Sequence, residues 1–150
     1  MQVFIIGTPY ETAVALDKRR LNKQIIELGQ IIDAINARIH TRKKVAWINH
    51  PVTKMYQDHI EWLYNYGEVL DLVRLGHTWD NSYLLQNTNT EAMLKKPYFH
   101  CQEFFDQMKR RLYTKDKQYY SQWSNLGESN INWYFVDGEW IKYENGKRIK

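Results

Sequence analysis

The chain has 150 residues, of which 43% are hydrophobic and 25% are charged, and its formal net charge is +4. This composition is typical of one globular domain and excludes a chain that is disordered throughout. The longest apolar run near the start, residues 3–6, is far shorter than the roughly 18 residues that cross a membrane, so no membrane partner is expected.

The first predicted element is a long helix over residues 12–39, preceded by an extended segment over 3–6 and a turn over 7–9. Thr12 is the predicted N-cap. Apolar residues then recur at spacings of three and four, which is the period of one buried helical face. This face comprises Leu21, Ile25, Leu28, Ile32, Ile35 and Ile39.

A second helix is predicted to start at Asn49-His50-Pro51 and to end near Leu75. A polar residue followed by proline is typical of a helix start, and a glycine such as Gly76 is typical of a helix end. Apolar and aromatic positions between them recur at helical spacing, namely Val52, Met55, Tyr56, His59, Leu63, Tyr66, Leu70 and Val73.

Residues 77–97 have a weak pattern, in which Asp80-Asn81-Ser82 favours the start of a short helix. After Pro97, a third long helix is predicted from the spacing of Phe104, Phe105, Met108 and Leu112. A further turn is expected to hold Tyr119-Tyr120.

The C-terminal segment has the pattern of a β-hairpin. Residues 132–136 and 139–143 alternate bulky and polar side chains on either side of Asp137-Gly138, which is a strong hairpin turn signal. Asn145-Gly146 marks another turn, and residues 147–150 are expected to fray.

These elements predict a mainly α fold in a single domain. Residues 1–130 are expected to form three principal helices, and residues 131–150 to add a small C-terminal β-hairpin and a basic tail to the same domain. The hairpin's role is open, with a structural or protein-interaction role as the alternatives.

Basic residues gather in four clusters, a distribution that suits a polyanion because each phosphate contact releases condensed counterions. The clusters are Lys18-Arg19-Arg20 with Lys23, Arg42-Lys43-Lys44, Lys95-Lys96, and Lys109-Arg110-Arg111 with Lys115 and Lys117. Taken singly, each cluster is more often only a solvated surface, but the four together favour a nucleic-acid partner. Aromatic residues make up 15% of the chain, and Trp47, between two predicted helices, is a candidate to stack on an exposed base.

No metal or other cofactor is expected. The five histidines form no closely spaced pair, and the sequence has neither a CxxC motif nor a glycine-rich phosphate loop. The single cysteine, Cys101, cannot form an internal disulfide, which fits the reducing cytoplasm of a bacterial cell or of a phage-infected host.

Glu27 is the candidate for chemistry, and it has two interpretations. In the first it is a surface carboxylate paired with Lys23 one turn earlier, which stabilises the helix by about 0.3–0.5 kcal/mol. In the second it steadies an oxocarbenium-like sugar and manages protons while an N-glycosidic bond breaks, with the nearby cations holding the adjoining phosphates.

The order of motifs along residues 3–120 resembles a known family. The first block is Leu16-Asp17-Lys18-Arg19-Arg20-Leu21-Asn22-Lys23-Gln24 with Glu27, the second is Trp47, His50-Pro51, Met55-Tyr56, Leu63 and Tyr66, and the third is Leu112, Lys115-Asp116 and Tyr119-Tyr120. They resemble the bacterial and phage pyrimidine-dimer DNA glycosylases, relatives of phage endonuclease V.

The resemblance implies an endonuclease V-like helical fold and excision of a damaged or modified pyrimidine from DNA, with AP-lyase cleavage of the strand left open. In that family an N-terminal α-amine attacks the sugar C1′ to form a Schiff base, and a glutamate of the first helix, matched here by Glu27, is essential. Because Gln2 favours retention of Met1, the attacking group is the Met1 amine, or Lys23, or there is no covalent step.

The site candidates follow from both arguments. Glu27 and Met1 are the catalytic candidates, and the DNA-binding candidates are Lys18, Arg19, Arg20, Lys23, Gln24, Trp47, Asn49 and His50. His50 either bonds a backbone group at a helix start or faces Glu27 and touches DNA. The alternative function is a non-catalytic DNA- or nucleotide-binding protein, such as a viral accessory factor, on the same scaffold.

Overall fold

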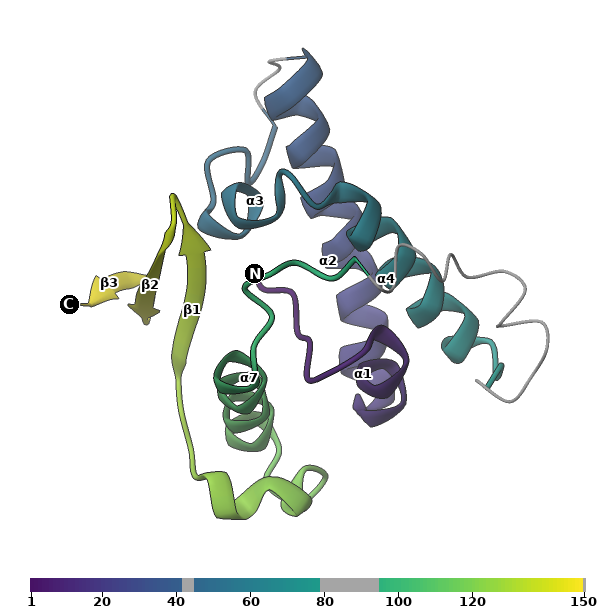
Figure 1. Ribbon diagram of the computed structural model, residues 1–150. Helices are drawn as coiled ribbons and strands as arrows, with labels where there is room; N and C mark the ends of the chain where they lie inside the picture. Colours follow the sequence, from purple (N-terminus) through teal and green to yellow (C-terminus); the bar gives the residue numbers. More distant parts are fainter. Residues whose placement is uncertain (42–44, 79–94, 150) are drawn as a thin grey trace.

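The computed structural model describes residues 1–41, 45–78 and 95–149. This part of the chain is mainly α-helical, with a small antiparallel sheet near the C-terminus (Figure 1). The short helix predicted after Asp80 and the basic cluster at 42–44 lie outside the described residues. Within those residues, no helix is long and apolar enough to span a bilayer.

The first predicted helix is two helices, α1 (Pro9–Ala15) and α2 (Lys18–Asn36), and a π-helical turn, η1 (Ala37–Thr41), follows. The chain becomes extended at Leu16, with ψ of 138°, and α2 starts after Asp17. The prediction of one continuous helix over 12–39 was therefore wrong.

The predicted cap at Thr12 was wrong as well, because Thr8 caps α1. The Thr8 hydroxyl accepts a hydrogen bond from the Glu11 N–H at 3.1 Å, and the Glu11 carboxylate accepts one from the Thr8 N–H at 3.4 Å, which is a capping box. Thr12 is buried inside α1, where its hydroxyl accepts a hydrogen bond from the Ile6 N–H at 3.0 Å.

The second predicted helix is also divided, into α3 (Pro51–Tyr56) and α4 (Ile60–Arg74). His50 caps α3 as the sequence suggests, since its side chain accepts a hydrogen bond from the Val52 N–H. The chain leaves α4 through Gly76, whose φ of 93° is the left-handed conformation that favours glycine.

The C-terminal half follows the prediction more closely. The third helix is α7 (Gln102–Lys115), a 3-10 segment η2 (Ser121–Leu126) comes next, and the predicted hairpin is formed by β1 (Ile131–Val136) and β2 (Glu139–Glu144). The tail predicted to fray instead adds a third strand, β3 (Lys147–Ile149), which pairs with β2.

Both turns of the sheet have positive φ at two successive residues, the pattern of type I′ turns. The φ values are 52° and 81° at Asp137-Gly138, and 52° and 77° at Asn145-Gly146. The backbone thus reverses twice at the two dipeptides that the sequence marks as turns.

The core lies between α2 and α4, which pack along each other, with α1 against α4 and α3 against both α2 and β1. The buried face of α2 includes Leu28, Ile31 and Ile35, whereas Ile39 is exposed. Gln24 is buried in this face too, although it is polar. The first residues of the chain run through the centre of the molecule, among α2, α7 and β1 (Figure 1).

Candidate active site

The start of the chain is fixed to α2 by the buried side chain of Gln24. Its Oε1 atom accepts a hydrogen bond from the Phe4 N–H at 2.7 Å, and its Nε2 atom donates one to the Gln2 carbonyl at 3.1 Å. The amide thus pairs with the backbone much as a neighbouring strand would. Gln24 is only 2% exposed, so this predicted DNA-binding residue holds the chain in place and presents no polar group to solvent.

Two tyrosines from other elements also hold the N-terminal segment, and together with Gln24 they form a clamp on residues 1–4. The Tyr66 hydroxyl of α4 donates to the Phe4 carbonyl, and the Tyr134 hydroxyl of β1 donates to the Met1 carbonyl at 3.1 Å. Helices α2 and α4 and strand β1 therefore determine together where residue 1 lies.

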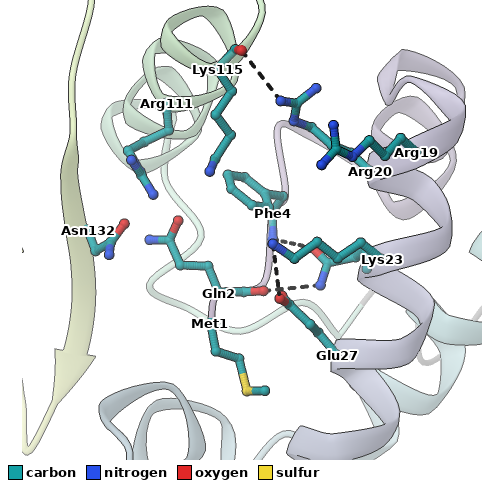
Figure 2. Close-up of a pocket in the computed structure, with 11 residues that line it drawn as sticks. Met1, Gln2, Phe4, Arg19, Arg20, Lys23, Glu27, Arg111, Lys115 and Asn132 are labelled. Carbon is teal, nitrogen blue, oxygen red and sulfur yellow. Dashed lines mark hydrogen bonds and ion pairs between the residues drawn. The ribbon is translucent and has the colours of Figure 1, made fainter. Parts of the chain in front are cut away.

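A cavity of about 240 Å³ opens beside this clamped segment (Figure 2). Its lining residues are Met1, Gln2 and Phe4 from the N-terminal segment, Arg19, Arg20, Lys23, Gln24 and Glu27 from α2, Arg111 and Lys115 from α7, and Asn132 from β1. Among the described residues this lining brings five cationic side chains around one carboxylate, a charge balance that suits a phosphate-bearing ligand.

Glu27 reaches this cavity from α2. Its side chain is 17% exposed, and one carboxylate oxygen lies 3.8 Å from the Lys23 ammonium, whose side chain is 68% exposed. The ion pair of the first interpretation therefore exists. It does not place Glu27 on an open surface, because the carboxylate also lines the cavity next to the first residue (Figure 2).

The electrostatics of the α-amine of Met1 differ from those of a surface amine. Partial burial lowers its pKa; the Glu27 carboxylate opposes this effect, and the Lys23, Arg111 and Lys115 cations add to it, so that the net pKa is lowered. Only a neutral amine is a nucleophile, and an ordinary α-amine already titrates about two pH units below a lysine. The site therefore increases the neutral fraction of this amine near pH 7.

Arg20 is held at the cavity by two neighbours. Its guanidinium lies 3.2 Å from the Asp17 carboxylate and donates to the Lys115 carbonyl at 3.5 Å. Asp17 in turn accepts a hydrogen bond from the Tyr120 hydroxyl. Burial opposes ionisation of Asp17, but the hydrogen bonds from Tyr120 and Arg20 outweigh it and lower the pKa of this carboxyl.

The remaining α2 candidates differ in position. Arg19 and Lys23 are exposed and line the cavity, whereas Lys18 is exposed and is not part of the lining. The structure thus brings most of the basic block of α2 to the same opening as Glu27.

The loop before α3 carries the other three candidates. Trp47 is 43% exposed and has a φ of 70°, and Asn49 is exposed and accepts a hydrogen bond from Arg38 at 3.1 Å. The His50 ring packs edge-on against Trp47 and Tyr134, at centroid distances of 5.4 and 5.6 Å. None of the three lines the cavity.

His50 has mainly the structural role, since its Nδ1 atom accepts a hydrogen bond from the Val52 N–H at 3.1 Å. Burial lowers the pKa of His50 to about 4, and the charge of the N-terminal amine adds to that effect. The imidazole is therefore neutral at pH 7, and it is close enough to the N-terminus to sense its charge.

Sequence reasoning did not place the residues that close the far side of the cavity. Arg111 and Lys115 were noted only as a basic cluster, Gln2 only for its effect on Met1, and Phe4 and Asn132 only as parts of extended segments. The Lys115 motif of the family pattern was the one signal that pointed to α7. Asn132 and Gln2 are more than 100 positions apart in the sequence, so no local pattern indicates that both line one cavity.

The fold and the site define a mainly α protein with a basic cavity in which a carboxylate lies beside the chain's first residue. The model of the pyrimidine dimer DNA glycosylase family matches residues 1–73, the part that contains Met1, α2 and Glu27. This match supports the family resemblance seen in the sequence motifs, and a DNA glycosylase family implies DNA as the substrate. No curated protein and no solved structure matches the chain.

Proposed function

We propose that this protein is a DNA glycosylase that removes a damaged pyrimidine, with the α-amine of Met1 as nucleophile and Glu27 as the acid–base group. The observation that carries the proposal is the meeting of these two groups in one basic cavity. Such a protein would act in the cytoplasm of a bacterial cell or of a phage-infected host.

The reaction would begin with attack of the neutral amine on the sugar C1′. A bond forms from nitrogen to C1′ as the bond from C1′ to the base breaks, and the base leaves with that electron pair and takes up a proton. The amine then loses a proton. Opening of the sugar ring breaks the C1′–O4′ bond, O4′ takes up a proton, and a protonated Schiff base remains. Glu27 would relay these protons and stabilise the positive charge that develops at C1′.

Strand cleavage would follow from the same intermediate. The protonated Schiff base makes the C2′ hydrogen acidic, so that a base can remove this proton while the C3′–O3′ bond breaks and the 3′ phosphate leaves. Water then hydrolyses the imine and frees the amine. Arg19, Arg20 and Lys115 would hold the neighbouring phosphates during these steps.

Met1 is preferred over Lys23 as the nucleophile for two reasons. The Met1 carbonyl is fixed by Tyr134, whereas the Lys23 side chain is 68% exposed and its ammonium is held only at 3.8 Å from Glu27. The pKa of the Met1 amine is also lowered, first by burial, from a starting value already below that of lysine.

Borohydride trapping on DNA tests the proposal. The protein would be incubated with a duplex containing a thymine dimer and with one containing an abasic site, and reduced during the reaction. We expect a covalent adduct whose peptide map places the DNA on residue 1.

A variant with one extra glycine before Met1 should lose most of the trapping, because the amine is moved from its place, whereas Lys23→Met should retain it. An adduct on Lys23 would overturn the assignment of the nucleophile. DNA binding with no adduct and no base release on either duplex would favour the non-catalytic DNA-binding alternative.

A further inference from the structure

The loop before α3 is held in place by hydrogen bonds, yet it exposes its largest side chain. The Trp47 carbonyl accepts one from the His50 N–H at 3.0 Å and one from the hydroxyl of the buried Thr53 at 2.6 Å. The Arg38 guanidinium of η1 donates to the next carbonyl, that of Ile48, at 3.4 Å. Trp47 is nevertheless 43% exposed, so the loop presents an indole to solvent.

The backbone of Trp47 has a conformation that few residue types adopt. The Ile48 N–H donates to the Val45 carbonyl at 3.4 Å, and Trp47 is the third residue of this turn with a φ of 70°, a position that usually has glycine or asparagine. The other non-glycine residues with positive φ in the described part of the chain are Asp137 and Asn145, whose side chains suit it. Such strain is common at functional sites, so this loop is a candidate for ligand contact.

A row of rings connects Trp47 to the first residue. The indole lies edge-on to the His50 ring at a centroid distance of 5.4 Å, and His50 lies edge-on to Tyr134 at 5.6 Å. The Tyr134 hydroxyl donates to the Met1 carbonyl at 3.1 Å. The charge of the N-terminal amine is also the second cause, after burial, that lowers the pKa of His50, so the amine is close to this row. Trp47 therefore lies near the Met1 end of the site, outside the cavity itself.

The phosphate-binding cations lie at the other end of the site. Figure 2 shows Arg20 and Lys115 at one end of the cavity and Met1 at the other, and in Figure 1 helices α3 and α7 lie on opposite sides of the first residue. A DNA strand that contacts these cations and brings a sugar to Met1 would continue towards the loop before α3. The two ring contacts that start at Trp47 span no more than about three base steps of roughly 3.4 Å. The indole is thus within reach of bases next to the attacked nucleotide.

We propose that Trp47 enters the base stack beside the lesion and stacks on the adjoining base, which holds the DNA open for the Met1 amine. This inference rests on the proposed function and names the residue that recognises distorted DNA. Opening the stack costs least at a damaged base, and an aromatic face replaces the lost stacking whatever the neighbouring base is. The contact is made to the neighbour, so the two joined bases of a dimer need not enter the cavity. Trp47 would thereby increase the preference for damaged DNA, whereas the cations bind damaged and intact DNA alike.

Binding to two matched duplexes tests the proposal. Affinity would be measured at fixed salt for a duplex with a thymine dimer and for the same duplex undamaged, in a Glu27→Gln background so that turnover does not interfere. Loss of stacking on one base lowers affinity by about five- to 150-fold, so Trp47→Ala should bind the dimer duplex at least about fivefold more weakly and the intact duplex nearly unchanged. Trp47→Phe should retain most of the preference. The matched control Tyr64→Ala removes an aromatic ring that is 54% exposed on α4 and should change neither affinity.

A glycine variant separates stacking from folding. Glycine adopts the positive φ of position 47 without strain, so Trp47→Gly should remain folded in a urea titration. It should lose the preference for the dimer duplex to the same extent as Trp47→Ala. A glycine variant that keeps the preference would overturn the inference, because the indole would then not be the group that recognises the lesion.

Photocrosslinking tests the contact directly. With 5-iodouracil placed on either side of the dimer and in the opposite strand, irradiation should attach the DNA to Trp47 from a position within about three nucleotides of the lesion. Crosslinks to other residues alone would overturn the inference, and so would equal losses of affinity on both duplexes in Trp47→Ala. Unchanged DNA binding with altered self-association in Trp47→Ala would make the indole a contact between protein copies instead.

Schiff-base trapping distinguishes this inference from the proposed function. At a preformed abasic site, with protein in excess, Trp47→Ala should be trapped at the wild-type maximal rate, because Trp47 takes no part in bond making. If the wild type is trapped while Trp47→Ala keeps its full preference for the dimer duplex, the stacking contact is wrong and the proposed function stands. If no adduct forms on either duplex while the preference and the crosslink depend on Trp47, the proposed function fails and the stacking contact stands.

Discussion

Two buried polar regions of this molecule can be compared directly: the cavity beside Met1 and the aromatic cluster around His100. His100 is 3% exposed, and its Nε2 atom lies 2.7 Å from the Tyr56 hydroxyl. Its ring is enclosed by Trp62 at a centroid distance of 4.7 Å and stacks on Phe104 at 5.8 Å. Burial lowers the pKa of His100 to about 3, with smaller contributions from His59 and Lys96.

In both regions burial is the main cause of a lowered pKa, that of the Met1 amine in the cavity and that of His100 in the aromatic cluster. A pKa shift alone therefore does not distinguish a functional site from a hydrophobic core. Hydrogen bonding separates them. His100 and Tyr56 satisfy each other, although the Trp62 N–H nearby has no partner among the described residues, whereas Gln2, Arg111 and Asn132 leave four atoms unsatisfied around an open volume. Changes in the cavity should alter chemistry more than stability, and changes around His100 should do the reverse.

The largest effect is expected from Glu27→Gln. Loss of a group that relays protons should lower base release by about 10²- to 10⁴-fold, while DNA affinity stays equal or rises because a negative charge leaves a basic cavity. Single-turnover kinetics and a binding titration at fixed salt would measure both. The matched variant Glu61→Gln, exposed on α4, should behave as wild type; a rate for Glu27→Gln equal to that of Glu61→Gln would remove the carboxylate from the mechanism.

The clamp gives the next largest effect. Gln24→Leu leaves the Phe4 N–H and the Gln2 carbonyl without partners, so we expect stability to fall by about 1–3 kcal/mol. Displacement of Met1 by about 1 Å should also slow trapping by about 10²-fold. Urea unfolding and trapping at an abasic site would test the two effects. Gln30→Leu is the control for the exposed face of α2. Full trapping in a destabilised Gln24→Leu protein would show that the clamp does not position the amine.

The His100 cluster should show itself in the pH dependence of stability. With a folded pKa of about 3 and an ordinary value near 6.5, His100 binds fewer protons in the folded than in the unfolded chain between these pH values, so the free energy of unfolding falls as the pH is lowered through this window. One such group contributes at most about 1.4 kcal/mol per pH unit. His100→Gln should flatten the slope and leave base release at pH 7 unchanged, whereas His40→Gln, on the surface, should change neither.

The same two regions show what the sequence could predict. Mainly helical structure, the third helix and the hairpin followed from periodicity and turn residues, and the catalytic candidates Glu27 and Met1 followed from the family pattern. The break at Leu16 was missed because the predicted apolar face begins only at Leu21 and does not define where its helix starts, although Thr8 and Glu11 have the spacing of a capping box. The Gln2 and Asn132 pair could not be predicted, since only the packing of β1 against the N-terminal segment brings them together.

The smallest effect is expected on the pH profile of the amine, which tests whether a single charge shifts the amine's pKa in addition to burial, the main cause of the pKa shift at His100. The Lys23 cation lowers the pKa of the Met1 amine, so Lys23→Gln should raise that pKa, and trapping should reach half its maximal rate at a higher pH. Because Lys23 is exposed, the displacement should be less than about one pH unit. Lys18→Gln removes an equal charge from the same helix outside the cavity and should leave the profile in place. A profile that is identical in all three proteins would mean that the Lys23 charge does not contribute to the amine's pKa. A downward displacement in Lys23→Gln would show that the trapped amine is not the one beside Glu27.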